Sequence, residues 1–192
     1  MAVAAAALSA LAGGLHGSLV RPGDPEYRSV RKPFIGRFDD ALPAAVVRCA
    51  TADDVVASLA FARTHDLPFA LRSGGHSFAD WSSTRGLVID LGPLDTVRLD
   101  GPTATVGPGA LAARLAAADR TVPCGWCPGV GAAGAVLGGG TACWAGCTAS
   151  VPTTCWPLKW RSPTAGWSGA TPSASRTCSG RCAARGVASS AR

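Results

Sequence analysis

The chain has 192 residues, and 47% of them are hydrophobic, which is enough apolar material for a core and too much for a wholly disordered protein. Its formal net charge of +6 comes from one end: residues 1–140 carry 12 basic and 12 acidic side chains, whereas residues 141–192 carry six basic ones and no acid. Because the main part of the chain has no basic stripe, a nucleic-acid partner is not expected.

The first 15 residues are rich in alanine and predict an amphipathic helix that ends at Gly13 and Gly14. They lack the basic start of a secretory signal and are too short to cross a membrane. We therefore expect no membrane association and favour a cytoplasmic location. A turn-rich connector with two prolines follows at residues 21–25.

A strand, a helix and a second strand are predicted within residues 44–71. Residues 44–49 form a short apolar run that is typical of a strand. Thr51 and Asp54 fit a capping box at the start of a helix, and apolar residues at helical spacing follow as far as Ala62. Residues 68–71 predict the next strand, which completes a βαβ unit.

Further strands are predicted at residues 86–91 and 103–107, and an Ala-rich helix at about residues 110–118. Mixed strands combined with helices indicate an α+β or α/β domain, and we classify the chain as α+β. No G-x-G-x-x-G motif follows the first strand, so the pattern does not favour a Rossmann domain.

A polar turn with two glycines follows the strand predicted at residues 68–71. Its sequence is Arg72, Ser73, Gly74, Gly75, His76 and Ser77. Two glycines let the backbone turn tightly and aim its N–H groups at one point, as loops that bind nucleotide phosphates do. His76 would then place a nucleophilic ring beside a bound cofactor. Taken alone, such a turn is more often an ordinary loop.

Residues 122–140 form a second glycine-dense segment, and this segment contains no charge. A helix predicted from about Ala132 would point its positive end at a phosphate, and the glycines would let the backbone approach a ligand closely. The alternative is a flexible linker. Linkers favour serine and other polar residues, however, whereas Val130, Val136 and Leu137 are interleaved here.

These motifs occur in the order and spacing of a known family, together with Val106–Ala110 and two N-terminal stretches at residues 21–27 and 31–34. Over about residues 8–140 the chain resembles the FAD-dependent oxidases of the vanillyl-alcohol oxidase/p-cresol methylhydroxylase (PCMH) type. Within them it is most similar to the berberine-bridge-enzyme-like branch. The resemblance implies an N-terminal helix and connector (1–36), a partial PCMH-type FAD-binding domain (37–140) and a tail (141–192).

The resemblance also implies how the cofactor is held. In that family the histidine of the turn bonds covalently to the flavin 8α-methyl group, which implies this role for His76. A cysteine bonded to flavin C6 lies in a pattern G-x-C-x-x-V-G-x-x-G, which here runs from Gly125 to Gly134 and implies Cys127 as a second tether. The implied cofactor-binding residues are Arg72, Ser73, Gly74, Gly75, His76, Ser77, Cys127, Val130, Gly131, Gly134, Gly138 and Gly139.

The family's chemistry is hydride transfer from a substrate C–H bond to FAD, followed by reoxidation by oxygen to give peroxide. The resemblance therefore implies that the intact protein is an FAD-binding oxidoreductase for a small hydroxylated or sugar-like substrate. The family's substrate pocket and catalytic base lie later in the chain than the region of resemblance. We therefore assign no catalytic residue and expect the chain as written to be truncated and inactive.

Four cysteines offer a competing interpretation. Cys124, Cys127, Cys143 and Cys147 have the spacing C-x2-C-x15-C-x3-C, which is close to that of a zinc ribbon. The alternative to the flavin enzyme is thus a small non-enzymatic module stabilised by zinc or disulfides. The flavin motifs in the same segment argue against it, and we expect no metal site.

Residues 141–192 differ from the rest of the chain, because they hold five of the eight cysteines and four of the six tryptophans but no acid, Tyr or Phe. We expect this tail to be disordered. When the third base of each codon is read with the first two bases of the next, residues 142–160 become compatible with G-L-L-G-R-V-H-G-x-x-x-D-N-L-L-A-x-E-V. This string resembles what the family carries after its L-G-G-G segment. The composition and the code together predict that the reading frame changes between about Leu137 and Thr141, in the gene or in its sequencing.

Overall fold

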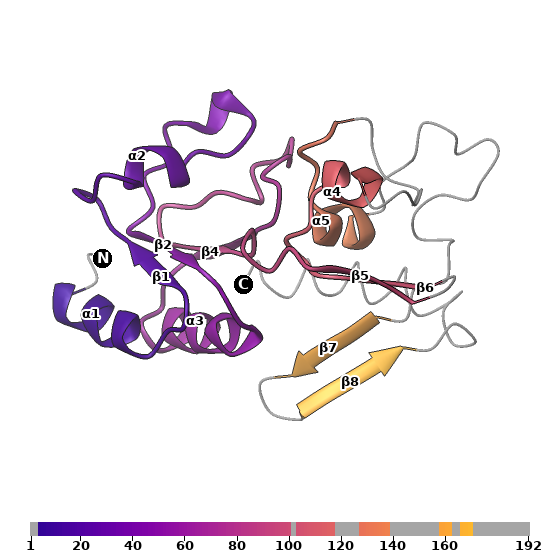
Figure 1. Cartoon of the computed structure of the whole chain (residues 1–192). Helices are drawn as coiled ribbons and strands as arrows, with labels where there is room; N and C mark the ends of the chain where they lie inside the picture. The colour runs from indigo at the N-terminus through magenta and orange to yellow at the C-terminus, as the bar shows by residue number, and fades with distance from the viewer. Residues whose placement is uncertain (1–3, 101–102, 118–126, 139–157, 163–165, 171–192) are drawn as a thin grey trace.

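The computed structural model describes residues 4–100, 103–117, 127–138, 158–162 and 166–170. A four-stranded sheet forms the centre of the N-terminal part (Figure 1). Its strands lie in the order β1 (Ser18–Val20), β2 (Ala45–Arg48), β4 (Leu87–Asp90) and β3 (Phe69–Arg72). β2 and β3 each run parallel to β4, whereas β1 is antiparallel to β2. Arg48 and Arg72 both pair with Asp90, so the three parallel strands end together at one edge of the sheet.

The predicted βαβ unit is confirmed as β2, α3 (Ala52–Thr64) and β3, with β4 inserted between the two strands. The capping box is also present. The Thr51 hydroxyl accepts a hydrogen bond from the Asp54 N–H at 3.2 Å, and the Asp54 carboxylate accepts one from the Thr51 N–H at 3.0 Å.

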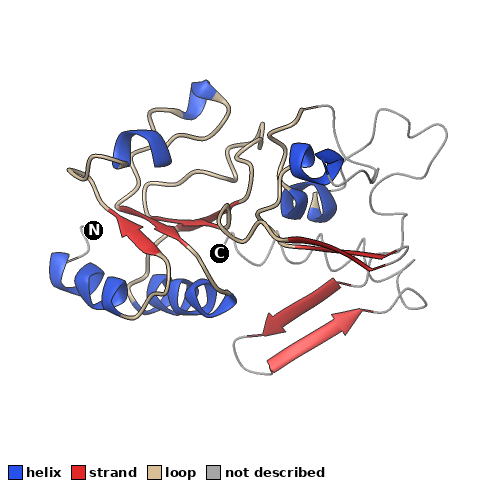
Figure 2. Cartoon of the chain, viewed as in Figure 1, coloured by secondary structure: helices blue, strands red, loops and turns tan. Residues whose placement is uncertain are grey.

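The helix predicted at the N-terminus is α1 (Ala5–Gly13), and it ends at the two glycines as expected. It lies beside α3 on one face of the sheet (Figure 2). α1 contributes Leu8 and Leu11 to the core. The other members of this buried cluster come from β2, α3, β4 and the residues just after the strands: Ala45, Val47, Cys49, Ala62, Leu87, Ile89 and Leu91.

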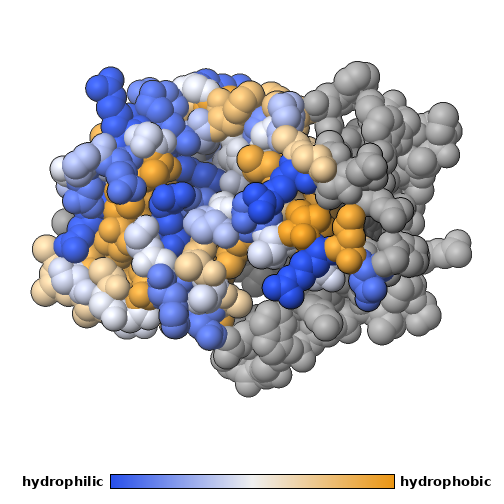
Figure 3. Space-filling model, in the orientation of Figure 1, coloured by the Kyte–Doolittle hydropathy of each residue, from blue (hydrophilic) through white to orange (hydrophobic). Residues whose placement is uncertain are grey.

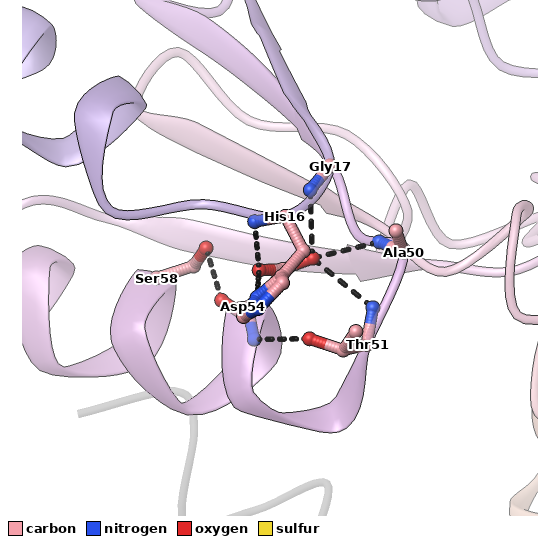
Figure 4. A network of polar contacts seen from close by, with 6 residues as sticks. All are labelled: His16, Gly17, Ala50, Thr51, Asp54 and Ser58. Carbon is pink, nitrogen blue, oxygen red and sulfur yellow. Dashed lines mark hydrogen bonds and ion pairs between the residues drawn. The ribbon is translucent and has the colours of Figure 1, made fainter.

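The loop before β1 is tied to α3 by the carboxylate of Asp54, which is 1% exposed (Figure 4). Besides the Thr51 N–H, it accepts hydrogen bonds from the backbone N–H groups of His16 (2.8 Å), Gly17 (3.0 Å) and Ala50 (2.8 Å). Burial raises the pKa of Asp54, but these hydrogen bonds lower it by more, so that the pKa lies below its ordinary value. The N-terminal segment is thereby joined to the same core as β2 and α3.

Two short helices follow the predicted connector at residues 21–25, and the sequence did not predict them: α2 (Tyr27–Val30) and a 3-10 helix at Gly36–Phe38. The strand predicted at residues 103–107 is β6 (Thr103–Val106), and it pairs with β5 (Val97–Asp100), another element without a sequence prediction. The two later predicted helices are present as α4 (Ala112–Ala117) and α5 (Ala132–Leu137). The predicted α+β class with mixed strands is confirmed.

Within the segment expected to be a disordered tail, the structure describes one antiparallel pair, β7 (Leu158–Ser162) and β8 (Gly166–Ala170). The alternation of Leu158 and Trp160 with polar residues is the local signal that favours a strand there. The rest of this segment lies outside the described residues.

Candidate functional site

The two glycine segments predicted to form one site lie in direct contact. The turn after β3 meets the loop before α5, and Gly131 at the start of α5 forms an isolated antiparallel bridge with Leu111. A Cβ atom on Gly74 would collide with the Gly129 carbonyl oxygen, and one on Gly131 would collide with the Ser73 hydroxyl. Both glycines are therefore required by the close approach of two backbones.

Gly75 adopts a left-handed conformation, with φ +70°, that L side chains rarely tolerate. Its carbonyl accepts a hydrogen bond from the Phe34 N–H at 3.1 Å. A Cβ on Gly75 would also lie 3.2 Å from the Phe34 backbone nitrogen. The second glycine of the turn thus shapes the backbone and admits the segment that contains Phe34.

The imidazole of His76 lies between these two segments. Its ring stacks on the ring of Phe34 with a centroid distance of 3.8 Å and an interplanar angle of 14°. Its Nε2 atom is buried without a hydrogen-bond partner, and a Cβ on Gly129 would lie 2.8 Å from it. Burial lowers the pKa of His76, so the neutral ring is favoured. A neutral imidazole with a free electron pair is the nucleophilic form.

Cys127 lies two residues before Gly129, and its carbonyl accepts a hydrogen bond from the Val130 N–H at 3.1 Å. Its thiol is free and partly buried. The Val130 carbonyl in turn accepts a hydrogen bond from the Ala112 N–H at 2.9 Å, which fixes the loop against the start of α4. Of the two predicted tethers, Cys127 thus belongs to the loop that contains Gly129, and His76 belongs to the turn that this loop contacts.

Arg72 performs a structural task within the site. Its guanidinium is buried and donates hydrogen bonds to four backbone carbonyls, those of Ser82 (2.9 Å), Val30 (2.7 Å), Arg31 (2.9 Å) and Lys32 (3.4 Å). Burial lowers its pKa, although Asp90 and Asp80 act in the opposite direction. Because its N–H groups donate to these backbone carbonyls, Arg72 holds the turn in place.

The remaining predicted residues differ in their surroundings. The Ser73 hydroxyl donates to the Pro108 carbonyl at 2.7 Å, and the Ser77 hydroxyl accepts from the Trp81 N–H at 3.1 Å. A Cβ on Gly134 would meet nothing within 4 Å, whereas Gly138 ends α5 with its N–H bonded to the Gly134 carbonyl. Gly139 lies outside the described residues.

A polar cavity of about 290 Å³ lies near the turn, between the 3-10 helix and the residues that follow Ser77. Its charged lining residues are Arg37, Asp40, Asp80 and Arg85, and its lining includes none of the predicted cofactor-binding residues. Polar and apolar patches alternate over the face shown in Figure 3, and Phe34 is 61% exposed. Among the predicted cofactor-binding residues of the turn, Arg72 and Gly75 are buried, whereas Ser73, Gly74, His76 and Ser77 are partly exposed.

Sequence reasoning missed two residues that shape this site. In the sequence, Phe34 belongs only to one of the N-terminal stretches of the resemblance, and its contact with His76 joins residues far apart in the chain. Gly129 had no assigned role, although it closes off the buried nitrogen of His76. No local pattern could have indicated either contact.

The described residues contain no group of three or more His, Cys, Asp or Glu side chains that could hold a metal ion. Three of the four cysteines in the zinc-ribbon spacing, Cys124, Cys143 and Cys147, lie outside the described residues. Among the helices that the structure describes, none is long and apolar enough to span a membrane.

The mixed sheet and the paired glycine segments define a cofactor-binding domain of the α+β class. The chain belongs to the FAD binding domain family, whose match covers residues 43–151. This confirms the resemblance to the PCMH-type flavoproteins and their berberine-bridge-enzyme-like branch, and it does not favour the alternative of a zinc or disulfide module.

Curated relatives support the same family. The chain is 34% identical over 133 residues to the FAD-linked oxidoreductase hasG of Aspergillus fumigatus, covering 64% of this chain and 28% of that protein. It is 29% identical over 133 residues to the (R)-6-hydroxynicotine oxidase of Paenarthrobacter nicotinovorans, covering 66% of this chain and 29% of that protein. The chain thus spans less than a third of the length of these relatives.

Solved structures show the same fold. The BBE-like 1 protein of Physcomitrella patens superposes with a TM-score of 0.77 at 25% identity, over 85% of this chain and 37% of that one. The xylooligosaccharide oxidase of Myceliophthora thermophila superposes with a TM-score of 0.74 at 25% identity, over 87% of this chain and 37% of that one.

Proposed function

We propose that this chain binds FAD as the cofactor-binding part of an oxidoreductase and that His76 attaches the flavin covalently. The observation that supports the attachment most directly is the state of the His76 ring. Its pKa is lowered by burial, and its Nε2 atom is enclosed by Gly129. We assign the new bond to Nδ1, because the enclosed nitrogen has no room for a ligand.

The proposed attachment joins an imidazole nitrogen to the carbon of the flavin 8-methyl group. One hydrogen atom is lost from each partner, and molecular oxygen takes up the corresponding two protons and two electrons as hydrogen peroxide. The chain's part is to keep the imidazole neutral, because a protonated ring has no electron pair for the bond. Burial of the ring, with Phe34 on one face and Gly129 at Nε2, serves this purpose.

We propose Cys127 as a second tether. Its thiol is free and lies in the loop that covers His76. Two bonds to one cofactor would fix its orientation more tightly than either alone, because each removes rotational freedom that the other leaves.

When bound, FAD supplies the hydride acceptor of the reaction. We propose a small hydroxylated or sugar-like substrate for the protein that carries this domain. Two similar proteins are named as a 6-hydroxynicotine oxidase and a xylooligosaccharide oxidase, and so differ in substrate. Because the chain spans less than a third of the curated relatives, residues beyond the region they share would select the substrate.

The attachment can be tested on the 192-residue chain. The purified protein is incubated with FAD, denatured in detergent, separated on a gel and examined for flavin fluorescence. We expect a fluorescent band from the wild type and from His65→Ala, and a weak or absent band from His76→Ala. His65→Ala is the matched control, because it removes a histidine that lies at the end of α3.

A double variant, His76→Ala with Cys127→Ser, separates the two tethers. If the single variant keeps part of the signal and the double variant loses it, both residues act as tethers. A wild-type chain that retains no flavin after denaturation would refute covalent attachment. Retention at wild-type level by the double variant would refute both residue assignments.

A further inference from the structure

Phe34 stands out because it contacts the proposed attachment residue and is nevertheless largely exposed. Its ring lies almost parallel to the His76 ring, at 14° and 3.8 Å between centroids, while 61% of its surface remains accessible. A large apolar residue in the core usually loses nearly all of its exposure. The position of Phe34 is therefore poorly explained by core packing, and its main described contact is the imidazole.

The backbone around Phe34 is held against the turn at several points. The Phe34 N–H donates to the Gly75 carbonyl, directly before His76, at 3.1 Å. The Arg72 guanidinium donates to the carbonyls of Arg31 (2.9 Å) and Lys32 (3.4 Å), just before Phe34. The glycine at position 75 leaves room for this approach. Phe34 and His76 are thus placed by one set of backbone hydrogen bonds.

The imidazole is restricted on two sides. Phe34 covers one face of the ring, and Gly129 lies against the edge that carries Nε2. A half-turn of the ring about its Cβ–Cγ bond would exchange Nε2 with Cε1 and Nδ1 with Cδ2, and it would leave the ring in the same plane. Tilting the ring out of that plane would break the stacking on Phe34 or push the ring against Gly129, so the two contacts together fix the plane of the imidazole.

We infer that Phe34 is the positioning residue for His76: it holds the imidazole in the plane in which Nδ1 is presented for attachment of the flavin. This inference rests on the proposed attachment at His76 and adds the element that makes the ring ready for it. Phe34 itself contributes no atom to the new bond.

The chain contains an internal comparison. Its three histidines are His16, His65 and His76, and His65 also meets an aromatic ring, that of Phe61. That pair is tilted by 47° at 4.3 Å and belongs to the end of α3. The imidazole signals of His65 should therefore remain constant when Phe34 is changed.

The first experiment needs no flavin. Nitrogen NMR of the full chain follows the tautomer and the titration of each imidazole in the wild type, Phe34→Ala and Phe34→Tyr. In Phe34→Ala we expect the pKa of His76 to rise toward its ordinary value and both tautomers to be populated, because one face becomes exposed to water. Phe34→Tyr keeps the aromatic face and should match the wild type. An unchanged His76 in Phe34→Ala would overturn the inference.

The second experiment measures the rate of covalent flavin incorporation. We expect Phe34→Ala to be about two- to ten-fold slower than the wild type, the range over which an aromatic pair contributes, and Phe34→Tyr to recover the rate. Phe78→Ala is the matched control, since this phenylalanine near the turn is 77% exposed. Should Phe34→Ala fail to fold, Phe34→Leu keeps the apolar volume without the ring.

The two experiments test the flavin attachment at His76 and the positioning role of Phe34 separately. If the wild type incorporates no flavin, the proposed attachment fails and Phe34 has no role in it, yet NMR still decides whether Phe34 orients the ring. If the wild type and Phe34→Ala incorporate flavin at equal rates, the attachment stands and the role of Phe34 is refuted.

Discussion

Glycine serves a different purpose at each position of the site. The sequence suggested that the glycines let the backbone approach a cofactor, whereas Gly74 and Gly131 have backbone or serine atoms of the other loop where a Cβ would stand. Gly134, three residues after Gly131, has open space around it. Glycines of the same motif thus differ in how much an added side chain would destabilise the fold.

We predict that Gly131→Ala destabilises the chain by about 1–3 kcal/mol, because the new methyl group must push Ser73 and the Gly74 backbone aside. Gly134→Ala is the matched control. It lies inside α5 with nothing within 4 Å of the new atom, so we expect a gain of about 0.5–1 kcal/mol. Urea unfolding of both variants measures the difference. Equal stabilities would mean that the two loops do not pack as described.

At the scale of elements, the Asp54 carboxylate is what joins the N-terminal segment to the sheet. It accepts four backbone N–H groups, two from the loop before β1 and two from the start of α3. β1 and α1 then complete the sheet edge and the core. Residues that precede the family match at position 43 are therefore structurally part of the domain.

We predict that Asp54→Asn lowers the stability of the chain by about 1.5–3 kcal/mol near pH 7, because an amide offers one acceptor oxygen where the carboxylate has two. The folded pKa of Asp54 lies below its ordinary value, so its contribution is present above that value and is lost as the pH falls through the folded pKa. When the pH is lowered below about 4, the stability of the variant should therefore fall less than the stability of the wild type.

Urea unfolding at neutral and acidic pH measures both effects. Asp100→Asn removes the same charge from an exposed position at the end of β5 and is the control. It should unfold at nearly the wild-type urea concentration. A pH dependence of Asp54→Asn identical to that of the wild type would show that the carboxylate does not hold the N-terminal segment.

The same residues show what the sequence could predict. Thr51 and Asp54 formed a recognisable capping box because both partners lie within one helical turn. The bonds from Asp54 to His16 and Gly17 were unpredictable, since they join residues 38 and 37 positions apart. The sequence did not predict β1, because three residues are too few to show an alternating pattern. β1 is a strand because it pairs with β2, which is distant in the sequence.

At the scale of the whole molecule, apolar side chains are buried in the sheet and again in the part that follows it. The four-stranded sheet encloses Val46, Leu87 and Ile89 completely. In the part that follows, Leu99, Leu111 and Leu137 are 44%, 38% and 45% exposed. Buried residues are also present there, since Ala110, Ala112 and Leu115 are 0%, 6% and 7% exposed, so the second part has a small core of its own.

The change in composition near residue 141 predicts a change of reading frame. Beyond about Thr141 the chain loses its acidic residues and gains cysteine and tryptophan, and the shifted frame yields a string resembling the flavin family. The family match itself runs to residue 151, so it does not locate the change. Sequencing the gene and its transcript across codons 135–145 is expected to reveal one inserted or missing base.

If such a base is found, the corrected frame should continue through the shifted string, and the full-length protein should bind FAD and turn over a substrate, with Phe34, His76 and Cys127 at its attachment site. If both the gene and the transcript keep the frame as given, the frame prediction is wrong. The cysteine-rich tail is then a genuine part of the protein, and flavin retention by the 192-residue chain becomes the test of what this domain does alone.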